Sequence, residues 1–317
     1  MKSTNSISAF QRASNRGFAA MLLAAGRSVL SKFYRLAGRR YVTRRIHSYR
    51  MILDLLDPGL SRGLMLFRTR EIDHKIMLER IVRPGMRIFD IGGNIGYYPL
   101  MELSLLAGAG ELIVVEPLPQ NVALLKRNLL LNNYPDVPVI QAAISNTPTA
   151  KTFYVSTHSN LGTFHPEGGI AKTLTGSTLE VETLTVPMLA QRFGPPDLLR
   201  MDIEGHEVEV FASMLDDISQ GAYAPTIIFE THPDRYGPDH DMVANLRRLF
   251  TLGYSVPLVS SSTEFDSDRL IRLGYKPGPR IATDATYRTL FSDISADDAI
   301  ELICRSSALR TVVLAKQ

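Results

Sequence analysis

The stretch from Arg87 to Tyr97, RIFDIGGNIGY, has the pattern of a buried strand that enters a glycine-rich turn and continues into a helix. Glycines let the backbone pass close beneath a ligand, and the amino end of a helix offers unpaired N–H groups to an anionic group. The stretch therefore predicts a cradle for a nucleotide or an amino-acid carboxylate. A turn of this kind alone is a moderate signal, so its sequence context decides the interpretation.

From about residue 86 onward, short β-branched apolar runs alternate with longer amphipathic segments, which is typical of βα units around a parallel sheet. Strands are predicted at 86–91, 111–116, 137–144, 198–202, 226–230, 254–258 and 311–315, and helices near 97–106, 120–132, 206–215 and 242–252. Segments 151–185 and 260–308 interrupt this alternation. Because loops at the carboxyl edge of a parallel sheet commonly determine specificity, we expect these insertions to form the acceptor pocket, with surface decoration as the alternative.

The second predicted strand ends at Glu116, followed by Pro117, and an acid there can accept hydrogen bonds from both hydroxyls of a ribose. A nicotinamide cofactor would use the same acid, but the glycines here do not supply its G-x-G-x-x-G frame. Asp90, beneath the turn, is placed to hold a methionyl ammonium indirectly or through water. These features favour S-adenosylmethionine, and simple capping of the neighbouring backbone is the alternative role for both acids.

Acidic residues also follow two later strands. Asp202 and Glu204 end the fourth strand, and Glu230 and His232 end the fifth. Strand ends at this edge face the ligand crevice, so we predict these four residues to be catalytic. Methyl transfer to an alcohol needs an aligned acceptor and removal of its proton; His232 suits proton removal near neutral pH, and Asp202 or Glu204 would orient the hydroxyl or act as base. Capping of helices and pairing with Arg200 is the structural alternative.

Together these motifs resemble the FkbM family of methyltransferases, whose pattern is D-I-G-A-N-I-G-x-x, E-P-x-P, K-x-D-x-E-G-x-E and a strand that ends in an acid. The corresponding segments here are DIGGNIGYY at 90–98, EPLP at 116–119, RMDIEGHE at 200–207 and FETH at 229–232. The match covers roughly 70–260. Gly93 replaces the usual alanine, and Arg200 replaces the usual lysine, which leaves any family role of that lysine open.

The resemblance implies an α/β fold with a Rossmann-like class I methyltransferase sheet of seven strands, the last one antiparallel, flanked by helices. It also implies S-adenosyl-L-methionine as donor and a hydroxyl of a sugar, glycan, lipid-linked or secondary-metabolite molecule as acceptor. The predicted cofactor-binding residues are Asp90, Gly92, Asn94, Gly96, Tyr97, Glu116, Pro117, Asn121 and Ala143. A non-catalytic S-adenosylmethionine-binding protein and a nicotinamide-dependent oxidoreductase are the alternatives. We predict no metal ligands, since spacing along a chain cannot show three ligands converging.

The chain divides into a basic, partly helical arm (1–50), a helical lead-in (51–85) and the methyltransferase domain (86–317). The arm holds eleven Lys and Arg residues and no Asp or Glu, which gives it a formal net charge of +11. The whole chain has a net charge of +3, so the other 267 residues have a net charge of −8. This asymmetry predicts an anionic partner for the arm, such as a phospholipid surface, and argues against a nucleic-acid enzyme. Apolar residues at helical spacing predict an amphipathic basic helix over 18–36, which either lies on an anionic membrane or docks on a protein surface.

Hydrophobic residues make up 45% of the chain and charged residues 21%, which is typical of a globular protein with a sizeable core. The single cysteine, Cys304, excludes an intrachain disulfide and a cysteine-based zinc cluster. The apolar part of 18–36 is too short to span a membrane, and no secretory signal is recognisable. We therefore expect a cytoplasmic protein, peripheral to the inner face of the membrane if the arm binds lipid; the oligomeric state stays open.

Overall fold

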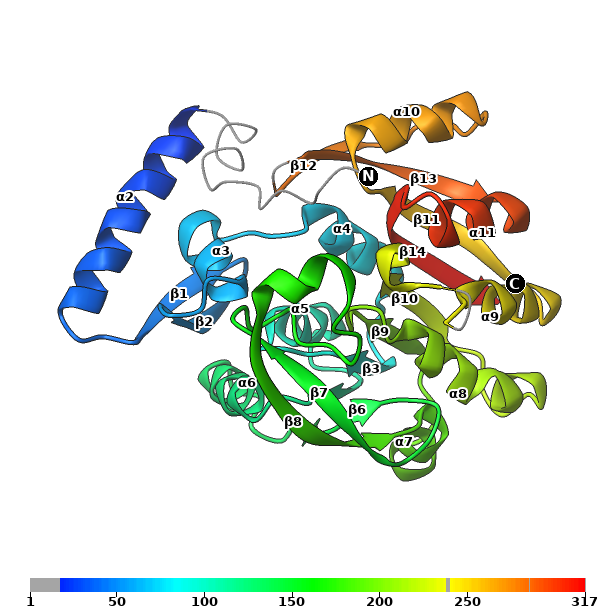
Figure 1. The fold of residues 1–317 in the computed structure, drawn as a ribbon, viewed down its shortest axis with the longest axis horizontal. Coiled ribbons are helices and arrows are strands. Elements are labelled where there is room, and N and C mark those ends of the chain that lie inside the picture. Colours follow the sequence, from blue (N-terminus) through cyan, green and yellow to red (C-terminus); the bar gives the residue numbers. More distant parts are fainter. Residues whose placement is uncertain (1–17, 238–239, 285, 317) are drawn as a thin grey trace.

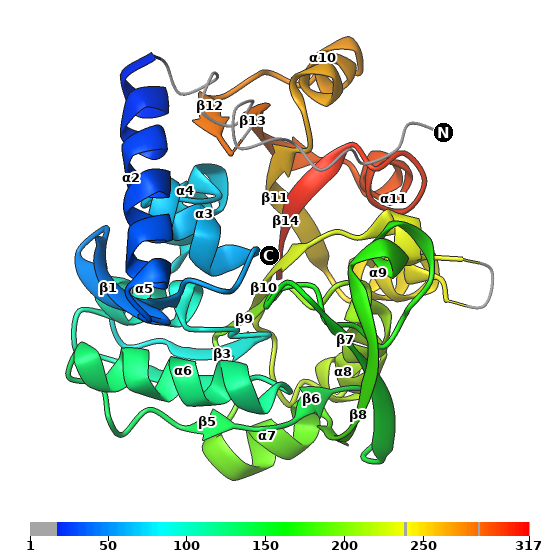
Figure 2. The same ribbon diagram turned by 60° about the vertical axis from the view of Figure 1, so that its left-hand side comes forward.

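The computed structural model describes residues 18–237, 240–284 and 286–316, and shows an α/β body with one long helix standing at its side (Figures 1 and 2). The α-helices are α2 (Phe18–Leu36), α3 (Leu60–Phe67), α4 (Ile72–Ile81), α5 (Tyr97–Leu106), α6 (Pro119–Leu131), α7 (Val186–Phe193), α8 (Glu207–Ser219), α9 (Met242–Thr251), α10 (Glu264–Arg272) and α11 (Ala296–Cys304). Two 3-10 helices, η1 (Gly168–Thr173) and η2 (Pro233–Arg235), lie in connections.

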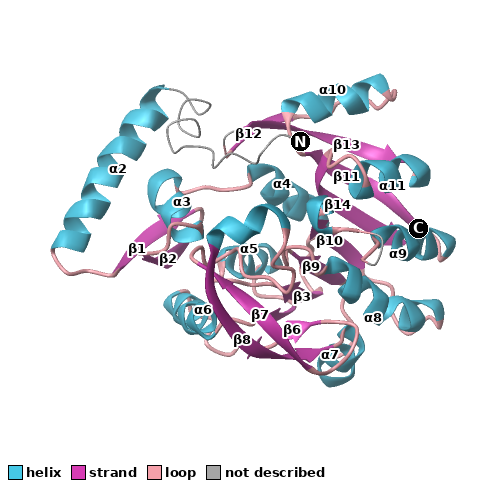
Figure 3. Ribbon diagram, in the orientation of Figure 1, coloured by secondary structure: helices cyan, strands magenta, loops and turns pink. Residues whose placement is uncertain are grey.

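A nine-stranded sheet forms the centre of the body (Figure 3). Its order is β12 (Arg280–Thr283), β13 (Thr286–Ile294), β11 (Tyr254–Ser261), β14 (Leu309–Lys316), β10 (Thr226–Glu230), β9 (Leu198–Met201), β3 (Arg87–Ile91), β4 (Glu111–Val115) and β5 (Val139–Ile140). Strands β10, β9, β3, β4 and β5 pair in parallel, and β14 is antiparallel to both β10 and β11. The antiparallel last strand is confirmed.

The expected number of seven strands is too low for this chain. The segment 260–308 supplies β13, which pairs antiparallel with β11, and β12, which pairs with β13, so two strands extend one edge of the sheet. This segment contains many polar residues and turns, so a prediction based on apolar runs does not detect its strands. The insertion lies at the opposite end of the sheet order from β4 and β5, and it contributes no lining residue to the pockets described below.

Both faces of the sheet are buried, because alternate residues of each strand enter different cores. On β3, Ile88 faces the core formed with α3 to α6, whereas Phe89 and Ile91 face the core formed with α7, α8, α9 and α11. This burial on both sides explains why the strands appear in the sequence as short continuous apolar runs. The predicted strands and helices of the body are confirmed to within a few residues, except that 137–144 divides into β5 and β6 (Ala143–Ile144).

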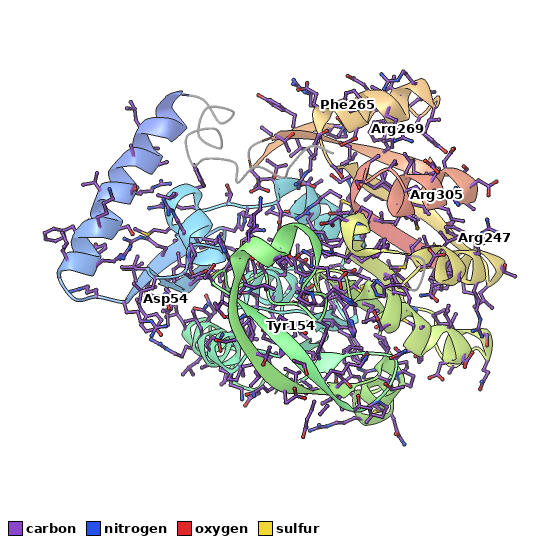
Figure 4. The ribbon with its side chains drawn as sticks, in the orientation of Figure 1. Asp54, Tyr154, Arg247, Phe265, Arg269 and Arg305 are labelled. Carbon is purple, nitrogen blue, oxygen red and sulfur yellow. The ribbon has the colours of Figure 1, made fainter. Side chains whose placement is uncertain are left out.

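The other insertion, 151–185, forms a long hairpin of β7 (Ala150–Ser156) and β8 (Leu174–Leu184). With β6 it makes a separate three-stranded sheet, which crosses in front of α5 and β3 in Figure 1. Figure 4 shows Tyr154 on this hairpin, where its backbone also pairs with Thr163 in the loop between the two strands. The loop between β7 and β8 is thereby folded back toward the carboxyl edge of the central sheet.

The N-terminal part differs from the expected division at residue 50. A hairpin of β1 (Tyr41–Ile46) and β2 (Tyr49–Asp54) crosses that boundary, so the lead-in begins with a strand and continues with α3 and α4. The predicted helix over 18–36 is confirmed as α2, while residues 1–17 of the arm lie outside the described residues. Across the ranges that the structure describes, none of the helices has the length and apolar character needed to span a membrane.

Candidate active site

A pocket lies at the carboxyl ends of β3, β4 and β9, where parallel α/β sheets bind ligands. Its floor and one wall come from residues at these strand ends, and its other wall comes from the hairpin insertion. Five of the predicted cofactor-binding residues line it, namely Gly92, Asn94, Glu116, Pro117 and Ala143. The remaining four, Asp90, Gly96, Tyr97 and Asn121, lie around it at positions given below.

The glycine-rich turn fits closely against the neighbouring strand. Gly92 has φ +85°, and a Cβ added to it would lie 2.4 Å from the backbone oxygen of Asp202. A Cβ on Gly93 would lie 2.2 Å from Cγ1 of Val114. Glycine at position 93, where the family pattern has alanine, is thus required by the packing of β4 against this turn.

Glu116 is buried and its carboxylate is held by three local donors. Oε2 accepts from the Asn94 backbone N–H at 2.9 Å, and Oε1 accepts from the Leu118 N–H and from Asn121 Nδ2, both at 3.0 Å. Burial nevertheless raises the pKa of Glu116 to about 7. Asn121 therefore does not line the pocket but orients the acid that does. A carboxylate has about four acceptor positions, so capacity remains for a ligand hydroxyl.

The hairpin insertion 151–185, expected from the sequence at the acceptor pocket, lines this pocket through residues that no motif singled out. The backbone oxygen of Ser159 accepts from Asn94 Nδ2 and Asn121 Nδ2, each at 2.9 Å. Asn160 lines the same pocket, and its buried Oδ1 has no hydrogen-bond partner in the described structure. An unpaired buried acceptor beside a pocket is placed to receive a donor from a ligand. Phe153 and Phe164 complete the wall with apolar surface.

A second, adjoining pocket shares Gly92, Asn94, Asn160 and Asp202 with the first. Its far side comes from the lead-in and the start of α5, through Leu60, Arg70, Glu71, Tyr97 and Tyr98. Tyr97 therefore lies at the site, whereas Gly96 lies behind it as the N-cap of α5. No signal in the sequence connected Arg70 or Glu71 with the glycine-rich turn, because they come from a segment without a recognisable motif.

Arg200, which replaces the usual lysine, connects the acids beneath the turn. It is 1% exposed; its Nη1 lies 3.0 Å from Asp90 Oδ1, its Nη2 lies 3.4 Å from Asp202 Oδ2, and its guanidinium lies 3.9 Å from the centroid of the Tyr98 ring. A planar fork can bridge two carboxylates and stack on a ring at once, which an ammonium group cannot. Asp90 is fully buried against Arg200 and lines neither pocket, so any influence on a bound ammonium is indirect.

His232 lies among four carboxylates. Its Nδ1 is 2.8 Å from Glu207 Oε1, and its Nε2 lies 3.8 Å from Asp202, 3.6 Å from Glu204 and 3.5 Å from Glu230. Burial alone would lower the pKa of His232, but Glu207 and Glu204 outweigh burial and raise it to about 10. His232 is consequently a cation near neutral pH, a state that does not fit the expected role of proton acceptor.

The other three predicted catalytic residues occupy different depths. Asp202 and Glu204 line the first pocket, and their side chains are 23% and 12% exposed. Glu230 is 2% exposed, pairs with Arg310, and lines neither pocket. Burial raises the pKa of Glu204, and His232 opposes this shift. The arrangement thus presents two carboxylates to the pocket and keeps Glu230 behind His232.

Comparison with known proteins gives a match to a family model described as the Methyltransferase FkbM domain, over residues 90–256. No curated protein sequence matches the chain. Among solved structures, methyltransferase FkbM from Methylobacillus flagellatus KT is 14% identical over 73% of this chain and 52% of its own length, with a TM-score of 0.36. TYW2 of M. jannaschii, solved in complex with AdoMet, is 12% identical over 81% of this chain and 88% of its own, with a TM-score of 0.38. This chain spans about half the length of the Methylobacillus protein.

Proposed function

Because this chain belongs to the FkbM family of S-adenosylmethionine-dependent methyltransferases, we propose that it methylates a hydroxyl group of a sugar, glycan, lipid-linked or secondary-metabolite acceptor. The observation that supports a hydroxyl acceptor is the convergence of Asp202 and Glu204 at the pocket that also contains Glu116. An alcohol is a weak nucleophile, so its methylation needs a carboxylate or similar base beside the donor.

The pocket has the chemistry that S-adenosylmethionine requires. Glu116 would accept the ribose hydroxyls, and the apolar side chains of Leu118, Ile144 and Phe153 would contact the adenine. Asn160 Oδ1, buried and unpaired, would accept a donor from the methionyl part. Gly92 lies so close to the Asp202 backbone that no side chain fits at this position, and its part of the pocket therefore stays open for a ligand.

When bound, S-adenosylmethionine supplies a methyl group on a sulfonium, and its sulfur leaves as a neutral thioether as the acceptor oxygen forms the new C–O bond. Glu204 would take the hydroxyl proton, because its carboxylate lines the pocket and burial raises its pKa. Asp202, held by Arg200, would orient the hydroxyl. The His232 cation, 3.6 Å from Glu204 Oε2, would stabilise the ionised form of that carboxylate before the proton moves.

The donor site and the catalytic residues can be tested separately. Calorimetry with S-adenosylhomocysteine should show binding that is lost in Glu116→Ala and retained in Glu204→Gln. Transfer of a labelled methyl group to lipid and glycan extracts should fall by about 10² to 10⁴ in Glu204→Gln. A labelled product that resists mild alkali and releases labelled methyl iodide in hot hydriodic acid, as a methyl ether does, would support the hydroxyl acceptor. A product cleaved by mild alkali would overturn it in favour of an ester, and binding without transfer to any extract would favour a non-catalytic binding protein.

We also propose that α2 lies on an anionic membrane surface. It contacts α3 through the buried Ala24 and through Arg27, whose Nη1 donates to the Leu66 backbone oxygen at 2.7 Å. The opposite stripe of the helix is uncovered: Leu22, Val29, Phe33 and Leu36 are 57%, 68%, 64% and 88% exposed. Among the described residues, docking of the helix on its own body therefore leaves this apolar stripe exposed. Basic residues beside this stripe, including Lys32 and Arg35, complement anionic headgroups.

The membrane proposal predicts that the protein sediments with vesicles of phosphatidylcholine and phosphatidylglycerol, and not with phosphatidylcholine alone. Phe33→Asp should abolish this sedimentation, since it places a charge in the apolar stripe. The matched control is Phe265→Asp, because Phe265 is also exposed, at 71%, and lies on α10 (Figure 4). Equal sedimentation of wild type and Phe33→Asp would exclude α2 as the contact.

A further inference from the structure

Three histidines and a glutamate meet beside the donor pocket, where the hairpin insertion contacts the start of α8, and His206 also lines that pocket. His165 follows the pocket-lining Phe164 in the loop between β7 and β8, His206 and Glu209 begin α8, and His240 follows η2. His206 is 3% exposed, and the side chains of Glu209 and His240 are 16% and 18% exposed. We call these four residues the histidine cluster.

The ligand atoms of the histidine cluster have the spacing of a metal site. His165 Nε2 lies 3.1 Å from His206 Nδ1, and Glu209 Oε2 lies 3.3 Å from His206 Nδ1 and 3.0 Å from His240 Nε2. The chosen atoms of His165, His206 and Glu209 all lie within 4.8 Å of one another. Tetrahedral zinc with bonds of about 2.0–2.1 Å separates its ligand atoms by about 3.4 Å, so a small expansion of the cluster would admit the ion.

Polar groups outside the cluster hold the outer ring nitrogens of two of its histidines. His206 Nε2 lies 3.0 Å from Ser145 Oγ, which also accepts from Lys151 Nζ at 2.8 Å. The other ring nitrogen, His206 Nδ1, faces the carboxylate of Glu209. A metal-bound histidine is oriented in this way, by donation from its other ring nitrogen to a polar group.

His240 repeats this pattern. Its Nδ1 lies 3.0 Å from the backbone oxygen of Arg235, which can only accept, so Nδ1 carries a proton. Its Nε2 faces Glu209 Oε2. Burial lowers the pKa of His240, but the hydrogen bond from its Nε2 to Glu209 outweighs burial and raises it, so a proton here neutralises the carboxylate. A metal ion would take the place of such protons, because metals bind the deprotonated forms of their ligands.

We propose that His165, His206 and Glu209 bind one divalent transition-metal ion, with His240 beside it as the hydrogen-bond partner of Glu209. Two imidazoles and one carboxylate form a ligand set typical of zinc, and water would take the fourth position. The ion would fasten the loop between β7 and β8 to α8, and so fix Phe164 and the wall of the donor pocket.

The test uses the full-length protein without a polyhistidine tag, treated with chelator and titrated with Co²⁺ in the absence of donor and acceptor. We expect one Co²⁺ per chain, with the visible absorption of a four-coordinate ion, and an increase in the midpoint of thermal unfolding. Glu209→Gln and His165→Ala should each weaken Co²⁺ binding at least about 100-fold, and His240→Ala should weaken it less.

His158→Ala is the matched control, because His158 lies in the same insertion and bonds to Thr157 rather than to the cluster. It should bind Co²⁺ as the wild type does. Circular dichroism of each variant separates loss of ligand from loss of fold. The proposal is overturned if the wild type binds no Co²⁺, if Glu209→Gln binds it unchanged, or if binding is lost in Asp202→Asn and kept in Glu209→Gln. None of these results depends on methyl transfer.

Discussion

Ionisation of Glu116 is expected to control the affinity for the donor. Burial raises the pKa of this carboxyl to about 7, and the ribose hydroxyls need an ionised acceptor. Below pH 7, Glu116 must lose its proton when the ligand binds. The affinity for S-adenosylhomocysteine should therefore fall by up to about tenfold for each unit that the pH decreases, and should be constant above pH 7. Calorimetry between pH 5 and pH 8.5 measures this slope. Glu116→Gln cannot titrate there, so an equal slope in that variant would assign the dependence to the ligand or to another group.

Glu102, on α5, should make the protein less stable as the pH rises. Neither of its buried carboxyl oxygens has a hydrogen-bond partner in the described structure, and burial, reinforced by Asp90, raises the pKa of Glu102 well above its usual range. The folded state thus holds this proton more tightly than the unfolded state does, so stability falls as the pH rises above the ordinary carboxyl pKa of about 4.3.

Glu102→Gln removes this titration. Urea unfolding of wild type and variant at pH 5, 6, 7 and 8 should therefore show curves whose difference grows in favour of the variant with increasing pH. Parallel curves would mean that Glu102 does not hold a proton in the folded state.

At the scale of elements, a buried ion pair joins the lead-in to the added strands. Asp73 on α4 accepts from Arg288 Nη1 on β13, at 3.1 and 3.2 Å, and from Ser260 Oγ on β11, at 2.7 Å. Asp73→Ala removes the carboxylate that Arg288 Nη1 donates to inside the protein, and should lower the free energy of unfolding by about 3–5 kcal/mol. Asp216→Ala removes an exposed partner of Arg248 and should cost less than about 1 kcal/mol. Similar losses in the two variants, measured by denaturant unfolding, would contradict this assignment.

The elements differ in how well they could be predicted. Strands β3, β9 and β10 are short apolar runs with Asp90, Asp202 and Glu230 at or beside their carboxyl ends, so the strands and these acids could be predicted from the sequence. The hairpin of β1 and β2 could not be predicted, because Arg44, Arg45 and Arg50 interrupt its weak alternation of apolar and polar residues. Strand β13 was likewise concealed by polar residues, which led to seven expected strands instead of nine.

The residues of the candidate site could also be predicted only in part. Motifs located Gly92 and Glu116, since their roles depend on local turns and strand ends. They did not locate Asn160, Arg70 or the histidine cluster, because those residues meet only through tertiary folding of the insertion and the lead-in. The charge of His232 also escaped prediction, since it depends on Glu207, 25 residues away along the chain.

At the scale of the whole molecule, the α2 helix and the donor site should act independently. No residue of α2 lines either pocket, and the helix contacts the body at α3. Removal of residues 1–37 should therefore leave the affinity for S-adenosylhomocysteine within about twofold, as for distant sites whose effects are additive. Calorimetry on the shortened and full-length proteins tests this, and a larger change would show coupling between the helix and the pocket.

Strand β14 has a consequence for the order in which the protein can fold during synthesis. It lies between β10 and β11, and Ile227 pairs with Leu314. The ribosome must therefore synthesise all of 227–308 before β14 can pair with β10 and β11. Until then, the unpaired edges of these two strands are exposed and can pair with other chains. Arrested nascent chains that stop before residue 309 should bind chaperones, and chains with β14 outside the exit tunnel should be released from them.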